Sequence, residues 1–158
     1  MDAVLKNGRV SRDMDLHSWQ EFTEDNVPRF SLKGKKHFAK ISSVYDGDTV
    51  KCIFGFGGEM FVWNCRISGV DTPELRTRNQ LEKKHGYLAR DELRKLILNK
   101  VAMITCGEFD KYGRLLIDIE LSDGTNISKW LVQEGLAFQY DGGTKKSWEE
   151  YLKEKSDV

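Results

Sequence analysis

The sequence predicts a mainly β fold of the α+β class: a five-stranded barrel with two to three helices. From residue 37 onward, five short apolar segments are bounded by turn-forming Gly, Asp and Asn residues. One amphipathic helical pattern separates the third of these segments from the fourth. The OB-fold is the common arrangement for five short strands with a helix inserted after the third.

The strands follow from composition and from the turns between them. Asp46-Gly47 marks the first turn, residues 57–59 mark the second, and residues 122–124 end the last strand. In chain order, the expected strands cover residues 38–45, 49–56, 60–68, 101–106 and 115–121.

The inserted helix is expected over residues 87–99, after a polar, basic loop over 75–86. Its apolar residues repeat at the spacing of one buried helical face: Ala89, Leu93, Leu96 and Ile97. A second helix is expected from an N-cap at Asn126 to Glu134, with Gly135 as its stop. Residues 147–155 suggest a third, short helix.

The pattern divides the chain into an N-terminal extension, residues 1–36, and a domain, residues 37–158. The extension has weak periodicity and is expected to be partly ordered. A short docking helix is expected within it, because Leu16, Trp19 and Phe22 have helical spacing.

Composition sets broad limits on function. Charged residues make up 32% of the chain and the formal net charge is zero, so any basic surface must be local. The three cysteines are widely spaced and form no C-x-x-C pair, which favours buried free thiols in a reducing compartment over zinc. The first twenty residues lack a signal-peptide core and no apolar run suits a membrane. An intracellular protein is therefore expected, in cytoplasm or nucleus.

Three short stretches concentrate carboxylates and arginines next to turns: residues 45–50, 65–74 and 110–114. Each alone reads more simply as an ordinary polar turn. Arg66 is less ordinary, because it lies on a half-buried strand and needs a carboxylate partner. Together, carboxylates suited to a hard cation and arginines suited to a phosphate indicate phosphoryl-transfer chemistry.

These motifs resemble those of the staphylococcal nuclease (thermonuclease) family. The resemblance runs from about Ile41 to about Tyr140 and continues through the stretch 126–137. It implies an OB-fold barrel and a calcium-dependent nuclease. A shorter C-terminal part and the segment 141–145 are similar to family versions encoded by large DNA viruses and some bacteria, so a viral origin is one expectation.

The resemblance also implies roles for individual residues. One calcium ion would be bound by Asp48, Asp71 and the backbone carbonyl of Thr72, with Asp46 just outside its ligand shell. The catalytic residues would be Glu74 as general base or water orienter, and Arg66 and Arg114 as groups that stabilise the phosphoryl transition state. Nucleic-acid contacts are expected from Lys111, Tyr112, Phe138, Tyr140, Arg76, Arg78, Lys83 and Lys84. For Phe138 and Tyr140 packing in the core is an equal alternative, and for the basic loop a merely solvated surface is another.

The sequence thus predicts a hydrolase that cleaves DNA and RNA, preferably single-stranded, to 3′-phosphate products. A monomer is expected, with no obligate protein partner and no membrane. Two alternatives remain open. One is a catalytically silent OB-fold module that binds single strands or a protein, and the other is a metal-stabilised scaffold that binds no nucleic acid.

Overall fold

A computed structural model of the chain describes residues 15–140 and 147–156. Inter-residue contacts divide the chain into two compact units, Met1–Ser31 and Leu32–Val158. The boundary expected from sequence after residue 36 stays a prediction. The segment 141–145, used above for the likeness to viral versions, lies outside the described residues.

In the first unit, the described residues hold a single 3₁₀ turn, Ser18–Glu21. The turn is preceded by Asp15, whose Oδ1 accepts hydrogen bonds from the Ser18 amide at 3.0 Å and the Ser18 hydroxyl at 3.1 Å. Trp19 and Phe22 meet edge to face, with ring centroids 5.9 Å apart. The expected helix is therefore only one short turn, and Leu16 is exposed.

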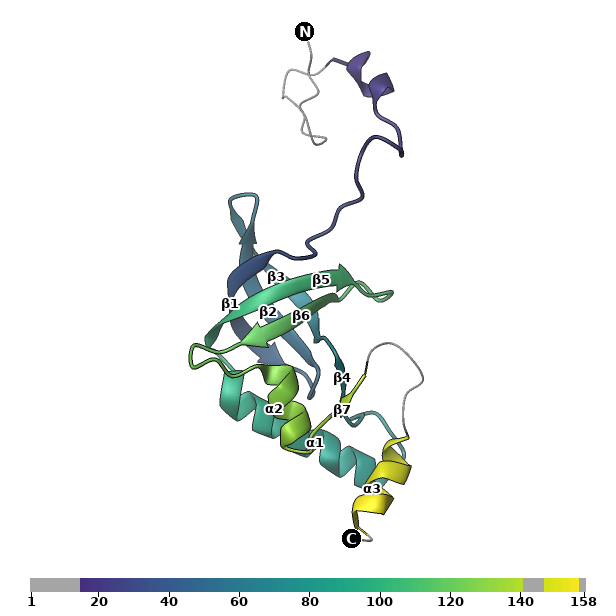
Figure 1. The fold of residues 1–158 in the computed structure, drawn as a ribbon, viewed down its shortest axis with the longest axis vertical. Helices are drawn as coiled ribbons and strands as arrows, with labels where there is room; N and C mark the ends of the chain where they lie inside the picture. The colour runs from purple at the N-terminus through teal and green to yellow at the C-terminus, as the bar shows by residue number, and fades with distance from the viewer. Residues whose placement is uncertain (1–14, 141–146, 157–158) are drawn as a thin grey trace. The chain divides into compact units, whose positions relative to one another are not determined.

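The second unit is a closed five-stranded barrel with helices at one end (Figure 1). Strand order around the barrel is β1-β2-β3-β6-β5, and β5 pairs with β1 to close it. All neighbours are antiparallel except β3 and β6, which run parallel. The barrel and the three helices confirm the predicted OB-fold. The barrel strands are β1 (Lys36–Val44), β2 (Thr49–Phe56), β3 (Glu59–Ile67), β5 (Val101–Phe109) and β6 (Leu115–Glu120).

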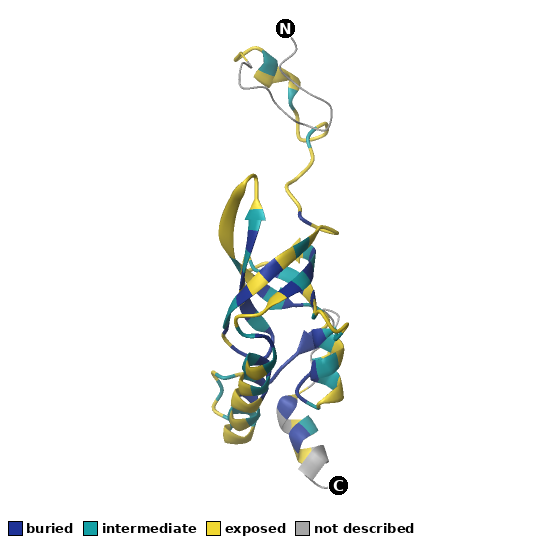
Figure 2. Ribbon diagram, turned by 90° about the vertical axis from the view of Figure 1, so that its left-hand side faces the viewer, coloured by how far each residue is buried: buried dark blue, intermediate teal, exposed yellow. Residues whose placement is uncertain are grey.

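Alternation along the strands builds the core. Side chains point alternately into and out of a barrel, so every second residue is buried (Figure 2). On β6, Leu115, Ile117 and Ile119 are all 0% exposed. The three cysteines, on β2, β3 and β5, are buried free thiols, as the sequence predicts.

Helix α1 (Gln80–Ile97) begins seven residues earlier than the sequence pattern indicates. Its N-cap is Asn79, whose side chain accepts a hydrogen bond from the Glu82 amide at 2.9 Å. The first two turns are polar and carry no apolar period, which is why they read as loop. Residues Ala89, Leu93 and Ile97 form the buried face, as predicted.

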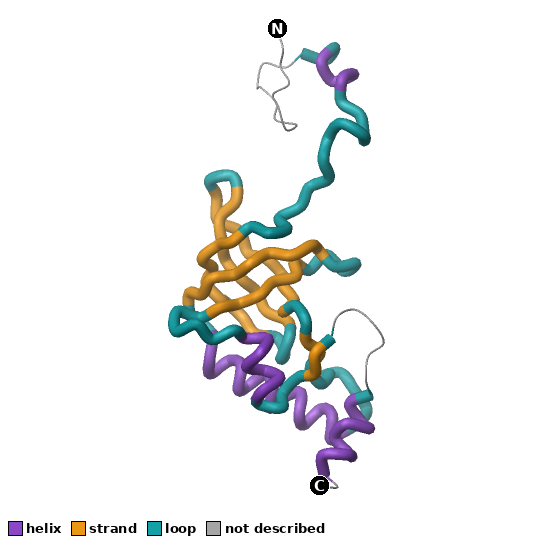
Figure 3. The backbone as a smooth tube through the Cα atoms, in the orientation of Figure 1, coloured by secondary structure: helices purple, strands orange, loops and turns teal. Residues whose placement is uncertain are grey.

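The remaining elements extend the domain beyond the barrel (Figure 3). Two short strands, β4 (Val70–Asp71) and β7 (Phe138–Gln139), pair with each other in a separate two-stranded sheet. Helix α2 (Ile127–Gln133) begins at the predicted N-cap, where Asn126 accepts from the Lys129 amide at 3.0 Å. Gly135 follows with φ 70°, the conformation of a helix stop. Helix α3 (Trp148–Ser156) comes last.

The Asn126 cap provides a test of how far α2 contributes to the fold. Asn126→Ala removes the acceptor for an otherwise unpaired helical amide and should lower the free energy of unfolding by about 1 kcal/mol. Urea denaturation measures this change. Asn126→Asp retains the acceptor and should unfold close to wild type; an equal loss in both variants would contradict the capping role.

Candidate functional site

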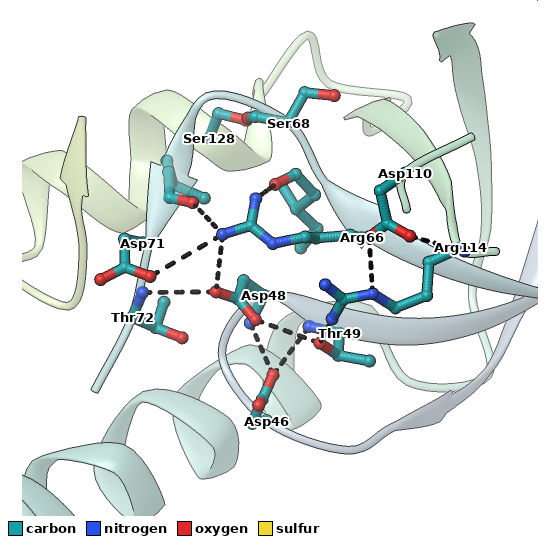
Figure 4. Close-up of polar contacts among 12 residues, drawn as sticks. Asp46, Asp48, Thr49, Arg66, Ser68, Asp71, Thr72, Asp110, Arg114 and Ser128 are labelled. Carbon is teal, nitrogen blue, oxygen red and sulfur yellow. Dashed lines mark hydrogen bonds and ion pairs between the residues drawn. The ribbon is translucent and has the colours of Figure 1, made fainter. Parts of the chain in front are cut away.

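The site is built where four segments meet: the β1–β2 turn, the end of β3, strand β4 and the β5–β6 turn (Figure 4). Asp46 shapes the first turn, because its Oδ1 accepts from the amides of Asp48 at 3.0 Å and Thr49 at 2.8 Å. These bonds hold the Asp46 carboxylate on its own backbone and aim Asp48 toward β4. Both aspartates are buried.

Glycine at position 47 allows the turn to lie close to β4 and α1. A Cβ at Gly47 would sit 2.7 Å from Thr72 Cγ2 and 3.0 Å from Ala89 Cβ. Such distances are far inside van der Waals contact, so any other residue would push the turn away from its neighbours. The close approach brings Asp48 against β4, where the Thr72 amide donates to Asp48 Oδ2 at 3.4 Å.

Arg66, on β3, lies between the carboxylates of Asp48 and Asp71. Its Nη2 is 3.4 Å from Asp48 Oδ2 and 3.7 Å from Asp71 Oδ1, and it donates to the Val70 carbonyl at 3.0 Å. Only 12% of the Arg66 side chain is exposed. A charge on this strand requires a carboxylate partner, and Arg66 has two.

Buried negative charge dominates the electrostatics of the site. Burial raises the pKa of Asp48 to about 7, the nearby charge of Asp46 adds to the effect, and Arg66 offsets it only in part. Next to it, the Thr72 hydroxyl is buried and has no hydrogen-bond partner among the described residues. Excess carboxylate and an unused oxygen together suit a hard divalent cation.

Asp71 has a second partner that the sequence pattern does not indicate. Nε1 of Trp148, on α3, donates to Asp71 Oδ2 at 3.0 Å. The indole also stacks on Phe138 with ring centroids 3.9 Å apart, so its position is fixed from two sides. Trp148 is buried, and its N–H also orients a site carboxylate.

The β5–β6 turn presents the second arginine. Asp110 Oδ1 accepts from the amides of Tyr112 and Arg114, each at 2.9 Å, and Gly113 turns the chain with φ 82°. Arg114 Nε donates to Asp110 Oδ2 at 2.8 Å, and its Nη1 reaches Thr49 Oγ1 at 3.3 Å. Burial opposes the charged form, but these backbone amides and the guanidinium lower the pKa of Asp110. Asp110 thus aims Arg114 at the β1–β2 turn.

An open pocket of about 860 Å³ connects the two arginines. Tyr112 forms part of its rim and is 73% exposed, with Lys111 Nζ 5.2 Å and Arg114 Cζ 5.6 Å from its ring centroid. The pocket is lined by Arg66, Ser68, Gly69, Asp110, Lys111, Tyr112, Arg114, Leu116, Gln139 and Tyr140. Cations and accessible aromatic rings in one pocket suit a nucleotide, because the cations bind phosphate and the rings stack on bases.

Glu74 lies in the segment after β4, and α1 holds that segment in place. The Glu74 amide donates to Glu82 Oε1 at 3.2 Å. A Cβ at Gly86 would lie 2.9 Å from the Pro73 carbonyl and 3.1 Å from the Glu74 carbonyl, so only glycine lets the segment pack this closely on the helix. Glu74 itself is exposed.

The other predicted contacts are divided between different places. Tyr140 lines the pocket, with Arg66 Cζ 5.8 Å from its ring centroid. Phe138 instead lies in an aromatic cluster with Trp148 and Tyr151. Arg76 and Lys83 line a second pocket, and Arg78 and Lys84 are exposed but line neither.

No group of three or more His, Cys, Asp or Glu within residues 15–140 and 147–156 has the arrangement of a metal cluster. The calcium ligands expected from sequence are two carboxylates and one backbone carbonyl, so they do not amount to three such side chains. Among the described helices, none has both the length and the apolar character needed to cross a membrane.

The fold and the site together define an OB-fold domain with an acidic and arginine-rich centre. The profile of the family described as staphylococcal nuclease homologue matches residues 64–157, more than half of the chain. The chain therefore belongs to the staphylococcal nuclease homologue family, as the sequence motifs predict.

Three relatives place the chain within the family. An "Uncharacterized endonuclease" of Escherichia coli O157:H7 is 26% identical over 102 residues, covering 65% of this chain and 60% of the relative. "Uncharacterized protein MJ1439" of Methanocaldococcus jannaschii is 30% identical, covering 65% and 58%. "Probable endonuclease LCL3" of Yarrowia lipolytica is 24% identical, covering 73% and 61%. The chain thus spans about three-fifths of the length of these relatives.

The raised pKa of Asp48 predicts how the metal-free protein responds to pH. Between the ordinary carboxyl value, 3.8, and about 7, the folded state holds a proton that the unfolded state has lost, so stability falls as pH rises through this window. Asp48→Asn removes this effect. In chelator, its melting temperature should exceed that of wild type at pH 8, and the gap should narrow steadily toward pH 4. A constant gap across that range would contradict the assignment.

Proposed function

We propose that the chain is a nuclease that hydrolyses phosphodiester bonds of DNA and RNA, with a preference for single strands. The observation that carries the proposal is the convergence of Arg66 and Arg114 on one pocket beside three buried carboxylates. Binding alone requires neither a half-buried arginine nor an uncompensated carboxylate, whereas phosphoryl transfer uses both.

The metal in this proposal is a single Ca²⁺ ion. Asp48, Asp71 and the Thr72 carbonyl would hold it, and Asp46 would support the site from its turn. When bound, the ion supplies positive charge that polarises a phosphate oxygen and stabilises the charged carboxylates. The raised pKa of Asp48 supports this fit, because it indicates that the carboxylate lacks compensating positive charge, and the unpaired Thr72 hydroxyl is a further oxygen beside it.

The residues of the chain would divide the reaction between them. Glu74 would orient water and accept its proton as the water oxygen bonds to phosphorus. The bond from phosphorus to the 5′ oxygen breaks, and that oxygen takes a proton from solvent, which leaves a 3′-phosphate and a 5′-hydroxyl. Arg66 and Arg114 would bind the phosphoryl oxygens through their planar guanidinium groups as negative charge redistributes.

Strand recognition would follow from the lining of the pocket. Lys111 and Arg114 bind phosphate, and the rings of Tyr112 and Tyr140 stack on any base. These contacts carry little sequence information, so cleavage should show weak base preference. A duplex would first have to fray, because paired bases do not offer their faces to a ring.

Cleavage assays test the proposal directly. Labelled single-stranded DNA and RNA are incubated with protein in calcium, magnesium or chelator. Calcium-dependent cleavage to 3′-phosphate ends is expected. Glu74→Gln should lower the rate by about 10²–10⁴-fold, and Arg114→Lys by about 10²–10³-fold because a bidentate contact is lost.

Glu92→Gln serves as the matched control, because Glu92 lies on α1 and pairs with Lys95 away from the pocket. It should cleave at the wild-type rate. Binding of oligonucleotide without cleavage in any metal would reject the nuclease and support a binding module. Calcium-dependent melting without oligonucleotide binding would support a scaffold.

The Trp148 indole N–H should contribute to metal affinity through Asp71. Trp148→Phe keeps an aromatic ring against Phe138 but removes the donor, and calcium affinity should fall roughly tenfold. Calcium-induced thermal shifts measure the affinity. Trp63→Phe is the control, because Trp63 Nε1 donates to the Phe54 carbonyl at 3.2 Å on the β2–β3 hairpin. Equal losses in both variants would contradict a positioning role for Trp148.

A further inference from the structure

A second pocket, of about 450 Å³, lies beside the candidate site and shares no lining residue with the first. Every charged residue in its lining is a cation. The lining consists of Tyr45, Leu75, Arg76, Thr77, Lys83, Tyr87, Arg90 and Arg94. We refer to this set as the α1 pocket.

Helix α1 supplies half of this lining from one face. Lys83, Tyr87, Arg90 and Arg94 are spaced four, three and four residues apart, the spacing of neighbours on a helix surface. The apolar residues of α1 occupy another face, against the barrel. The polar first turns of the helix, which the sequence pattern leaves as loop, therefore form part of a continuous cationic face.

The cations of the α1 pocket are poorly compensated. Among the described residues, the side chains of Arg76 and Lys83 make no hydrogen bond or ion pair. Arg90 is the exception, with Nη2 2.9 Å from Asp91 Oδ1. Arg94 Nε donates to the Val44 carbonyl at 3.0 Å, which fixes the guanidinium without neutralising it. Cations with so few acidic partners around one pocket suit an anion.

Chain connectivity ties the α1 pocket to the candidate site. Tyr45 directly precedes Asp46, and Leu75 directly follows Glu74. The end of β1 is also bonded to α1 through Arg94, and the β1–β2 turn is packed on α1 at Gly47. The Asp46–Asp48 turn and Glu74 therefore link the α1 pocket to the pocket of Arg66 and Arg114.

The aromatic rings indicate which anion fits. Tyr45 is 50% exposed and Tyr87 is 39% exposed, and Arg90 Cζ lies 4.5 Å from the Tyr87 ring centroid. An isolated phosphate or an acidic peptide would use the cations alone. A single-stranded polynucleotide offers phosphates to the cations and base faces to the rings.

We propose that the α1 pocket is a second nucleotide subsite, which binds a single strand next to the phosphate held by Arg66 and Arg114. The link to cleavage rests on the nuclease function proposed above, whereas the binding itself does not. The subsite makes affinity depend on strand length, because a dinucleotide fills only the first pocket and a longer strand fills both.

The test removes two cations from the α1 pocket with Lys83→Gln and Arg90→Gln together. Arg94 stays, because its bond to Val44 supports the turn. The control is Lys95→Gln with Lys100→Gln, which removes the same charge from exposed positions outside the pocket. All variants are made in the Glu74→Gln background, so that a labelled twelve-nucleotide oligothymidylate is cut far more slowly than it is bound. Fluorescence anisotropy gives Kd at several salt concentrations.

The subsite variant should raise the Kd of the twelve-nucleotide strand roughly tenfold at 0.1 M salt and reduce the salt slope by about 1.4, for two phosphate contacts. Its affinity for a dinucleotide should match the control. Equal affinity of the two variants for the longer strand would overturn the proposal. So would an equal loss of affinity for poly-L-glutamate, because the pocket would then recognise charge alone.

The two proposals fail in different ways. If wild-type protein cleaves with calcium but the subsite variant binds the strand as tightly as the control, only the subsite proposal is rejected. If the protein never cleaves but the subsite variant shows the expected loss of binding, only the proposed nuclease function is rejected.

Discussion

Three buried carboxylates with one half-buried guanidinium among them form the constraint on which the site depends. Asp46 is satisfied by the amides of its own turn, and Arg66 lies between Asp48 and Asp71. Water cannot solvate the remaining charge, so the pKa of Asp48 rises to about 7. This concentration of buried charge lowers the stability of the fold at this point, and it is the feature on which the proposed cation site rests.

The rest of the domain serves to keep these groups together despite their repulsion. The closed barrel fixes β3, and thus Arg66, beside the β1–β2 turn. Helix α1 supports the other side of the site, and two glycines allow the close packing. Gly47 lets the β1–β2 turn lie against Thr72 and Ala89, and Gly86 of α1 lets the segment of Glu74 lie against the helix. A helix that reads as simple packing in sequence is therefore also the support of the site.

Sequence predicted what is encoded locally. The turns at Asp46 and Asp110 follow from Asx chemistry, and the caps at Asn126 and Gly135 follow from helix-end chemistry; each is observed. The predicted start of α1 was wrong, because the first turns of the helix are polar and show no apolar period. Asn79 and Glu82, which have the spacing of a capping box, mark its true start. Contacts between distant segments had no local signal. Trp148 reaches Asp71 across 77 residues of sequence, and Arg94 reaches Val44 across 50.

Because the net charge of the chain is zero, any attraction for a polyanion depends on local cations such as those of the two pockets. A basic protein attracts nucleic acid over long range, whereas this chain has as many acidic as basic residues and no net field to steer a strand. Any attraction for a strand would have to come from local cations, and the α1 pocket offers them: its lining holds no carboxylate, although Arg90 is paired with Asp91 beside it. In the first pocket the two arginines are partly neutralised, since Asp110 pairs with Arg114 and two aspartates lie against Arg66. On the function proposed above, the arginines that act on the phosphate are partly neutralised, so the cations beside the site would supply much of the attraction for the strand.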